Sequence, residues 1–302
     1  MNRVELVGVD GSNPLGFLAA LGLLRVATLA SPGARLGFAA DGSFIAFLDG
    51  IENSPDLAAL VAADAKRAGS PSWRLTYAKT EKRGTKEVAD LKAPPEEFQK
   101  FLVRCLNCWM GGDGEAVAYA AAFGTDVAVD GKGNTKPTAF HFTAANQQFL
   151  GSVDEIRESL TQEWIETSLF RGHGEKPGRN LRWDPGAERN WALMAGNPND
   201  DGTRVDAPLE WLAFRGLPLL PSFPRGARII TTAVFGRGDD IFFTWPLWSP
   251  PASLQTVRSA LQLDWTGNAS ERAVRGVFAV CKSSIRRTSQ GFGNFGPPVV
   301  TC

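Results

Sequence analysis

The strongest pattern in the chain is a continuous apolar run over residues 14–30, in which leucine, alanine, phenylalanine and glycine occupy nearly every face of a helix. Residues 3–9, directly before it, are typical of a short strand. Ser12 and Asn13 are good N-cap residues, and Pro14 suits the first position of a helix. A helix that is apolar on all sides has to be buried. The pattern therefore predicts that this strand–turn–helix opening lies in the core.

Hydrophobic periodicity predicts further elements along the chain. Helices are expected at residues 55–68, 96–110, 154–170 and 253–263, the last of them capped by Ser253. Strands are expected at residues 42–48, 140–142 and 277–282, and a β-hairpin at residues 227–248 with its turn at residues 236–240. The mixed order of these elements predicts an α+β fold with short antiparallel sheets and packed helices.

Two segments show little periodicity. Residues 78–95 are basic and are interrupted by Gly84, Pro94 and Pro95, which predicts a long exposed loop. Residues 171–206 are rich in glycine, proline, asparagine and arginine, and they predict an irregular loop that is functional or partly disordered. We expect an N-terminal α+β lobe over residues 1–150 that carries the basic loop, and a C-terminal lobe over residues 151–302.

The composition indicates a globular protein. Of 302 residues 43% are hydrophobic, and nine Trp and 19 Phe can fill a sizeable core. Lys and Arg total 32, as do Asp and Glu, which disfavours a free, strongly basic nucleic-acid binder. The apolar run is interrupted by Arg25, falls short of the ~20 residues that span a bilayer, and follows the acids Glu5 and Asp10, unlike a signal peptide. Four cysteines do not suggest a disulfide framework, so we expect a cytoplasmic protein with reduced thiols.

The short motifs do not indicate catalysis. Cys105-x-x-Cys108 lacks a second ligand pair and lies in a helical segment, so a core position is favoured over a metal or redox site. His141 and His173 have no nucleophile signature nearby, and the glycine patterns of nucleotide-binding loops are absent. We therefore predict no catalytic residues, no metal and no cofactor.

Basic residues are concentrated in three stretches despite the neutral total. Flexible Lys and Arg beside glycine and aromatic residues suit contact with phosphates and stacking with bases, although a solvated surface is the alternative for each stretch. The polar run at residues 146–148 adds weaker candidates, which a buried amide network would explain equally well. The predicted nucleic-acid contacts are Lys79, Lys82, Arg83, Lys86, Arg171, Lys176, Arg179, Arg182, Lys282, Arg286, Arg287, Asn146 and Gln147. Phe292 and Phe295 in the C-terminal tail are candidates for stacking on a base or for contact with a partner protein.

Several segments, in order along the chain, resemble a subunit family of type I-G (formerly I-U) CRISPR systems. The first is LVGVDGSNPLGFLAALGLLR at residues 6–25. It is followed by FHFTAANQQFL (140–150), WDPGAERNWAL (183–193), LEWLAFRGLPLLPSFP (209–224), FFTWPLWSPPASLQTVRSAL (242–261), and GVFAVCKSSIRR with NFGP (276–297). The ordered set is more specific than any one segment, several of which are only apolar runs.

This resemblance implies a non-catalytic, large-subunit-type component of a Cascade-like complex, from a family whose members are sometimes labelled an extension of the helicase-nuclease. The implied partners are guide RNA, target double-stranded DNA and the other effector subunits, namely the backbone and the helicase-nuclease, in a hetero-oligomer. In such complexes the guide reads the target sequence, and protein reads a short flanking motif and holds backbones. No family active-site residue maps onto these motifs.

Two other classes remain open from the sequence. One is a metal-dependent nuclease or nucleotide-processing enzyme with carboxylates gathered from Asp10, Asp41, Asp184 and Glu188. The other is a protein–protein scaffold without nucleic-acid contacts. Metal-dependent cleavage by the purified chain would favour the enzyme, and insensitivity of DNA affinity to charge reversal at Lys82, Arg83 and Lys86 would favour the scaffold.

Overall fold

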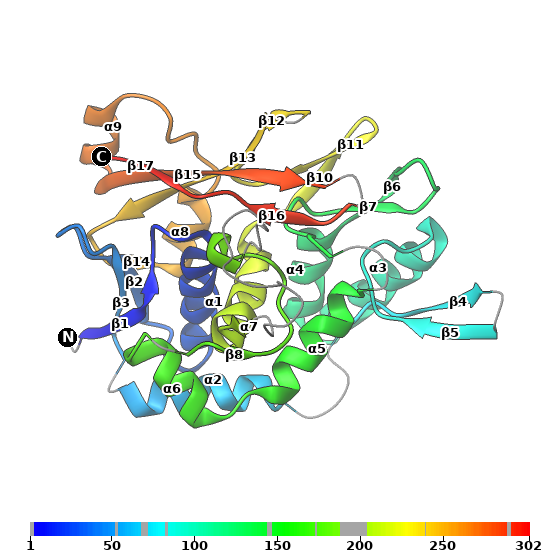
Figure 1. The fold of residues 1–302 in the computed structure, drawn as a ribbon, viewed down its shortest axis with the longest axis horizontal. Helices are drawn as coiled ribbons and strands as arrows, with labels where there is room; N and C mark the ends of the chain where they lie inside the picture. Colours follow the sequence, from blue (N-terminus) through cyan, green and yellow to red (C-terminus); the bar gives the residue numbers. More distant parts are fainter. Residues whose placement is uncertain are drawn as a thin grey trace, which may run out of the picture.

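A computed structural model describes residues 3–51, 54–67, 72–81, 84–143, 147–172, 174–187, 204–238, 240–288 and 291–302. It confirms the α+β class, because helices pack against several antiparallel sheets (Figure 1). The α-helices are α1 (Pro14–Ala30), α2 (Ser54–Ala65), α3 (Pro95–Met110), α4 (Gly114–Phe123), α5 (Phe149–Ser159), α6 (Gln162–Phe170), α7 (Ala207–Gly216), α8 (Leu254–Ala260) and α9 (Ala269–Val274). Short 3₁₀ turns are η1 (Pro185–Ala187) and η3 (Leu217–Leu219).

Two larger sheets frame the helices. The first has the order β1-β3-β2-β14 and is built from β1 (Arg3–Asp10), β2 (Arg35–Phe38), β3 (Ile45–Asp49) and β14 (Ala252–Ser253). The second has the order β12-β13-β15-β16, and β17 also pairs with β15. Its strands are β12 (Val234–Arg237), β13 (Asp240–Trp248), β15 (Val277–Arg287), β16 (Gly293–Phe295) and β17 (Val299–Thr301). Because β14 belongs to the N-terminal sheet, the second half of the chain completes a sheet of the first half.

Four two-stranded ribbons complete the strands. They are β4 (Tyr77–Glu81) with β5 (Gly84–Val88), β6 (Gly124–Val129) with β7 (Thr135–Pro137), β8 (Lys176–Pro177) with β9 (Arg204–Val205), and β10 (Ser222–Arg225) with β11 (Arg228–Thr231). The ribbons β4–β5 and β10–β11 lie at the periphery of the fold (Figure 1). Within the described residues, no helix is both long and apolar enough to cross a membrane.

The apolar helix α1 is buried in the core, as its pattern predicts. Asn13 caps it by accepting a hydrogen bond from the Leu15 amide at 2.8 Å. Aromatic rings of the second sheet pack against it: Phe17 lies 5.7 Å from Trp245 between ring centroids. One hydrophobic core contains buried side chains from both halves of the chain. The boundary between lobes at residue 150 stays a prediction.

Two glycines allow α1 and α7 to approach each other closely. A Cβ atom on Gly22 would lie 1.7 Å from the Leu212 carbonyl oxygen, and one on Gly216 would lie 2.5 Å from the Leu18 carbonyl oxygen. Neither helix has room for a larger residue at this crossing without moving its backbone.

We expect Gly22→Ala to lower the free energy of unfolding by about 1–3 kcal/mol, because the added methyl group separates two packed backbones. The gain of about 1 kcal/mol in helix propensity does not offset this loss. Chemical denaturation followed by tryptophan fluorescence measures the effect. Gly33→Ala is the control, because a Cβ atom there meets open space, and its stability should be unchanged or slightly higher. Equal stability of Gly22→Ala and the wild type would contradict the close approach.

Residues 78–95 do not form the expected loop. Ala78 to Val88 belong mainly to the hairpin β4–β5, in which Tyr77 is opposite Val88. The Tyr77 hydroxyl donates to the Lys92 carbonyl at 2.8 Å, and the following residues Leu91 and Ala93 are buried. The prolines start helix α3 instead of interrupting a loop. The basic composition of the segment therefore did not reveal a β-hairpin, and the residues that follow this hairpin are buried in the core.

The strand predicted at residues 140–142 is also wrong. Phe140, His141 and Phe142 are all buried, so the alternation of a strand with one exposed face is missing. Their carbonyl groups accept hydrogen bonds from the Trp183 indole (2.9 Å), the Arg287 guanidinium (3.1 Å) and the Gly293 amide (3.0 Å), respectively. Partners from distant parts of the chain thus replace a strand ladder.

The helix predicted at residues 154–170 is two helices, α5 and α6. The apolar stripe is buried as predicted, but Leu160 is extended and Thr161 starts a new helix by accepting from the Trp164 amide at 3.2 Å. A threonine cap therefore outweighs the continuous periodicity at this point.

The C-terminal elements differ from their predicted bounds. The hairpin at residues 227–248 is present as β12–β13, but its first strand is interrupted at Ala233, whose φ of 63° lies in the left-handed region, and β11 pairs with β10 instead. Ser253 caps α8 as predicted, and that helix ends at Ala260. Strand β15 is longer than predicted and is followed by β16 and β17. The irregular segment at residues 171–206 includes β8, η1 and β9, and residues 188–203 lie outside the described part.

Candidate nucleic-acid interface

The hairpin β4–β5 and its connection carry four of the predicted nucleic-acid contacts, with Glu81 and Glu87 in the same strands. It extends away from the helical body at one end of the molecule (Figure 1). Lys79 and Lys86 are both exposed and directly opposite each other in the strand register. Directly opposed residues point to the same face of a ribbon, so both amines lie on one side of the arm. Lys82 and Arg83, which are also predicted contacts, connect the two strands and lie outside the described residues.

Lys282 and Arg286 lie on the second sheet. Both are exposed residues of β15, and they alternate with the buried residues Ser283 and Ile285. The side chains of Lys282 and Arg286 therefore project from the sheet face opposite the core. The Lys282 ammonium lies 3.7 Å from the centroid of the Phe242 ring on β13.

Arg182 and Arg287 are close to the segment at residues 139–143. Arg287 donates to the carbonyls of Ala139 and His141, each at 3.1 Å. The half-buried Arg182 lies 4.5 Å from the Phe292 ring centroid, and burial lowers its pKa. Arg287 thus has hydrogen-bond partners within the protein that account for its position. The Phe292 ring is covered by the Arg182 guanidinium, so this face of the ring is not open to a base.

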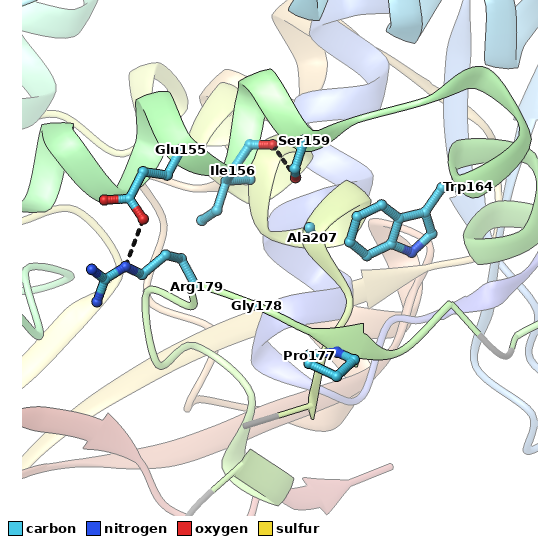
Figure 2. A pocket seen from close by; sticks show the side chains of 8 residues that line it. All are labelled: Glu155, Ile156, Ser159, Trp164, Pro177, Gly178, Arg179 and Ala207. Carbon is cyan, nitrogen blue, oxygen red and sulfur yellow. Dashed lines mark hydrogen bonds and ion pairs between the residues drawn. The ribbon is translucent and has the colours of Figure 1, made fainter. Parts of the chain in front are cut away.

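Lys176 and Arg179 are close to a cavity of about 500 Å³ between α5, α6 and the segment around β8. Figure 2 shows the ion pair between Arg179 and Glu155 at one side of this cavity, with a distance of 2.6 Å from Nε to Oε2. The Lys176 ammonium lies 4.5 Å from the Trp164 ring centroid. Arg171 is exposed just after α6. Both Lys176 and Arg179 therefore have intramolecular partners that account for their positions.

The side chain of Gln148 has a structural role. The Gln148 side-chain oxygen accepts from the Ala89 amide at 2.7 Å and links the exit of the hairpin to α5. Gln147 is half-buried beside it, and Asn146 lies outside the described residues. The interaction of Gln148 fits the buried amide network that the sequence left as the alternative.

The carboxylates that were candidates for an enzyme site accept hydrogen bonds within the protein where they are described. Asp10 accepts from the Ser12 amide and hydroxyl, and Asp41 accepts in the same way from Ser43. Asp184 accepts from the Asn13 side-chain amide at 3.1 Å, and Glu188 lies outside the described residues. Among the residues that are described, no group of three or more His, Cys, Asp and Glu could hold a metal ion.

The cysteine and histidine motifs occupy structural positions where they are described. Cys105 is buried on α3, and burial raises the pKa of its thiol to about 11, while Cys108 is half-buried. His141 Nε2 lies 2.8 Å from Asp90 Oδ1, and burial lowers the pKa of the ring. The His141 side chain thus joins the hairpin exit to the segment at residues 139–143. His173 lies outside the described part.

Sequence reasoning missed two aromatic residues beside Lys282. Phe235 is 41% exposed, and its register partner on β13 is Phe242. The sequence offered no clear signal, because residues 243–248 of β13 are all buried and the alternation that would mark an exposed face is missing there. Without the register of β13 against β12 and β15, these aromatic residues looked like core.

No protein-family model matches the chain, and no curated protein matches its sequence.

Proposed function

We propose that this chain is a non-catalytic, large-subunit-type component of a type I CRISPR RNA-guided complex in the cytoplasm. In that complex it contacts the target DNA near the flanking motif, the guide-RNA backbone, or both. Its partners are then guide RNA, double-stranded target DNA and the other effector subunits. The support from sequence is the ordered resemblance over most of the chain.

The observation that carries the proposal is the projecting hairpin β4–β5. Lys79 and Lys86 are exposed and directly opposite each other on one face of this ribbon, so a polyanion that lies along that face can contact both amines. Two-stranded ribbons fit into the grooves of nucleic acids. The formal net charge of the chain is zero, so its charge does not favour long-range attraction of nucleic acid. A projecting hairpin therefore suits local contact with nucleic acid within an assembly.

We expect Lys79→Glu/Lys86→Glu to weaken binding of target DNA by the assembled complex. If each lysine neutralises one phosphate, the slope of log affinity against log salt concentration falls by about 2 in the variant. Electrophoretic mobility shift at several salt concentrations measures both effects. Lys100→Glu is the matched control, since it reverses an exposed lysine on α3 that is paired with Glu97.

Three results decide between the classes. Unchanged affinity and salt slope in the double variant would favour a scaffold. Metal-dependent cleavage of DNA or RNA by the purified chain, lost on changing Asp184, would favour the enzyme. Copurification of the chain with guide RNA and effector subunits, together with the reduced salt slope, would support the proposal.

A further inference from the structure

The inner face of the second sheet is covered, and its outer face is exposed at the end that carries Phe235 and Phe242, whereas Thr244 and Pro246 farther along β13 are buried on that same face. Its inner face contacts the core through Phe243 and Trp245 of β13 and Cys281 of β15, which are fully buried. Helices α1, α4 and α7 lie on that side (Figure 1). The outer sheet face is formed by Phe235, Phe242, Lys282, Ser284 and Arg286.

The strand register shows how these residues lie next to one another on the sheet. Phe235 is opposite Phe242, and Phe242 is opposite Ser284, so two phenylalanines lie side by side across neighbouring strands. Lys282 and Arg286 are two residues away from Ser284 on either side, which places one cation before and one after the aromatic row. The Lys282 ammonium rests on the Phe242 ring at 3.7 Å.

The charges at this end of the sheet favour an anionic ligand. Lys282, Arg286 and Arg237 are exposed there, against the exposed acid Asp240, which is opposite Arg237 in the register. A flexible lysine side chain can leave the ring and follow a phosphate when a base takes its place. Aromatic rings on a sheet with cations at their sides are the arrangement by which proteins hold unpaired nucleotides.

We infer that the outer sheet face binds single-stranded nucleic acid, with bases stacked on Phe235 and Phe242 and phosphates held by Lys282 and Arg286. A duplex keeps its bases inside the helical stack, so it offers these rings nothing to stack on. The inference shares with the proposed function only the premise that the chain meets a nucleic acid. It assigns a ligand class to a surface other than the hairpin.

The test compares two fluorescent probes by anisotropy on the full-length chain: a 15-nucleotide DNA strand, and the same strand with abasic positions in its centre. Both probes carry the same phosphates, so a difference in affinity measures stacking. We expect the wild type to prefer the intact strand by about five- to 150-fold per stacked base. Phe235→Leu/Phe242→Leu should remove most of that preference and leave the residual, salt-dependent binding.

Phe223→Leu is the control, because Phe223 is 51% exposed on β10, outside this sheet, and its change should leave the preference intact. Phe235→Leu alone is the second variant if the double change impairs folding, and half of the effect is then expected. Equal affinity for intact and abasic strands in the wild type overturns the inference, as does an undiminished preference in folded Phe235→Leu.

The hairpin variant separates this inference from the proposed function. Lys79→Glu/Lys86→Glu should weaken duplex binding and keep the preference for the intact strand. If the hairpin variant loses duplex affinity and the wild type has no such preference, the proposed function stands and the sheet site is wrong. If the preference is present and duplex affinity is unchanged in the hairpin variant, the sheet site stands and the role of the hairpin is wrong.

Discussion

We expect Arg215→Met to lower the free energy of unfolding by about 3–5 kcal/mol, because the change removes the buried cation that faces the Asp64 and Glu115 carboxylates. Arg215 is 2% exposed on α7. Its guanidinium lies 2.9 Å from Asp64 of α2 and donates to the Tyr119 hydroxyl of α4 at 3.0 Å. It also pairs with Glu115, and Arg25 of α1 lies 3.7 Å from the same Glu115 oxygen.

This network joins four helices through one side chain. Burial by itself would lower the pKa of Arg215, but the negative charges of Asp64 and Glu115 and the Tyr119 oxygen overcome it, so the pKa is raised and the guanidinium stays charged. Removing this cation alone leaves the buried Asp64 carboxylate paired with the exposed Arg67 at 3.1 Å and without its buried partner. Removing both partners should cost less than the sum of the two single changes.

Urea denaturation of Arg215→Met, Asp64→Leu and the double variant measures the coupling. Arg215→Lys keeps the charge but not the planar fork, and should lie between the wild type and Arg215→Met. Arg179→Ala is the control, because the Arg179–Glu155 pair has side chains 52% and 55% exposed and should contribute less than about 1 kcal/mol. A loss below about 1 kcal/mol for Arg215→Met would contradict the role of the buried pair.

The sequence indicated which segments are buried better than it indicated their partners. The apolar run of α1 and the stripe of α5 and α6 were predicted to be buried, and they are. The Arg215 network was not predicted, because Arg25, Asp64, Glu115 and Arg215 are far apart in the chain and have no spacing in common. A buried ion pair between distant residues leaves no local pattern.

Local cues failed where tertiary contacts replaced a local ladder or loop. The sequence of residues 140–142 alternates as in a strand. In the structure, however, the carbonyl groups of these residues accept hydrogen bonds from Trp183, Arg287 and Gly293. The basic composition of residues 78–95 suggested a loop. In the structure, Tyr77, just before this segment, forms a cross-strand pair with Val88 within it. For the predicted contacts, the structure shows which side chains lie exposed on the hairpin and the second sheet and which, like Arg287, donate to backbone carbonyls, and this distinction needs the folded chain.

The last expected result concerns Glu210 and the pH dependence of stability. Glu210 is 2% exposed in the first turn of α7, and its Oε2 atom has no hydrogen-bond partner among the described residues. Burial raises its pKa to about 8; the backbones of Leu181 and Trp183 lower it, and the negative charges of Asp184 and Asp206 raise it further. Burial also raises the pKa of Asp206 to about 6.

The sign of the effect follows from proton linkage. The folded state holds the Glu210 proton more tightly than the unfolded chain, so this stabilisation is complete below the ordinary pKa of 4.5 and is lost as the pH rises to about 8. Each pH unit in that window removes up to about 1.4 kcal/mol. We expect Glu210→Gln, which is neutral at every pH, to become more stable than the wild type by several kcal/mol at pH 9, on the order of the full linkage.

Asp206→Asn isolates the electrostatic part of this shift. Asp206 caps α7 by accepting from the Leu209 amide at 3.1 Å, and asparagine is an equally good cap, so the helix start is preserved. Loss of the Asp206 charge should lower the pKa of Glu210 and move the fall in stability to lower pH. Guanidinium denaturation between pH 4 and pH 9 for the wild type, Glu210→Gln and Asp206→Asn measures all three curves. A constant difference between Glu210→Gln and the wild type across that range would mean that Glu210 keeps the same pKa folded and unfolded, and would refute its burial as a protonated acid.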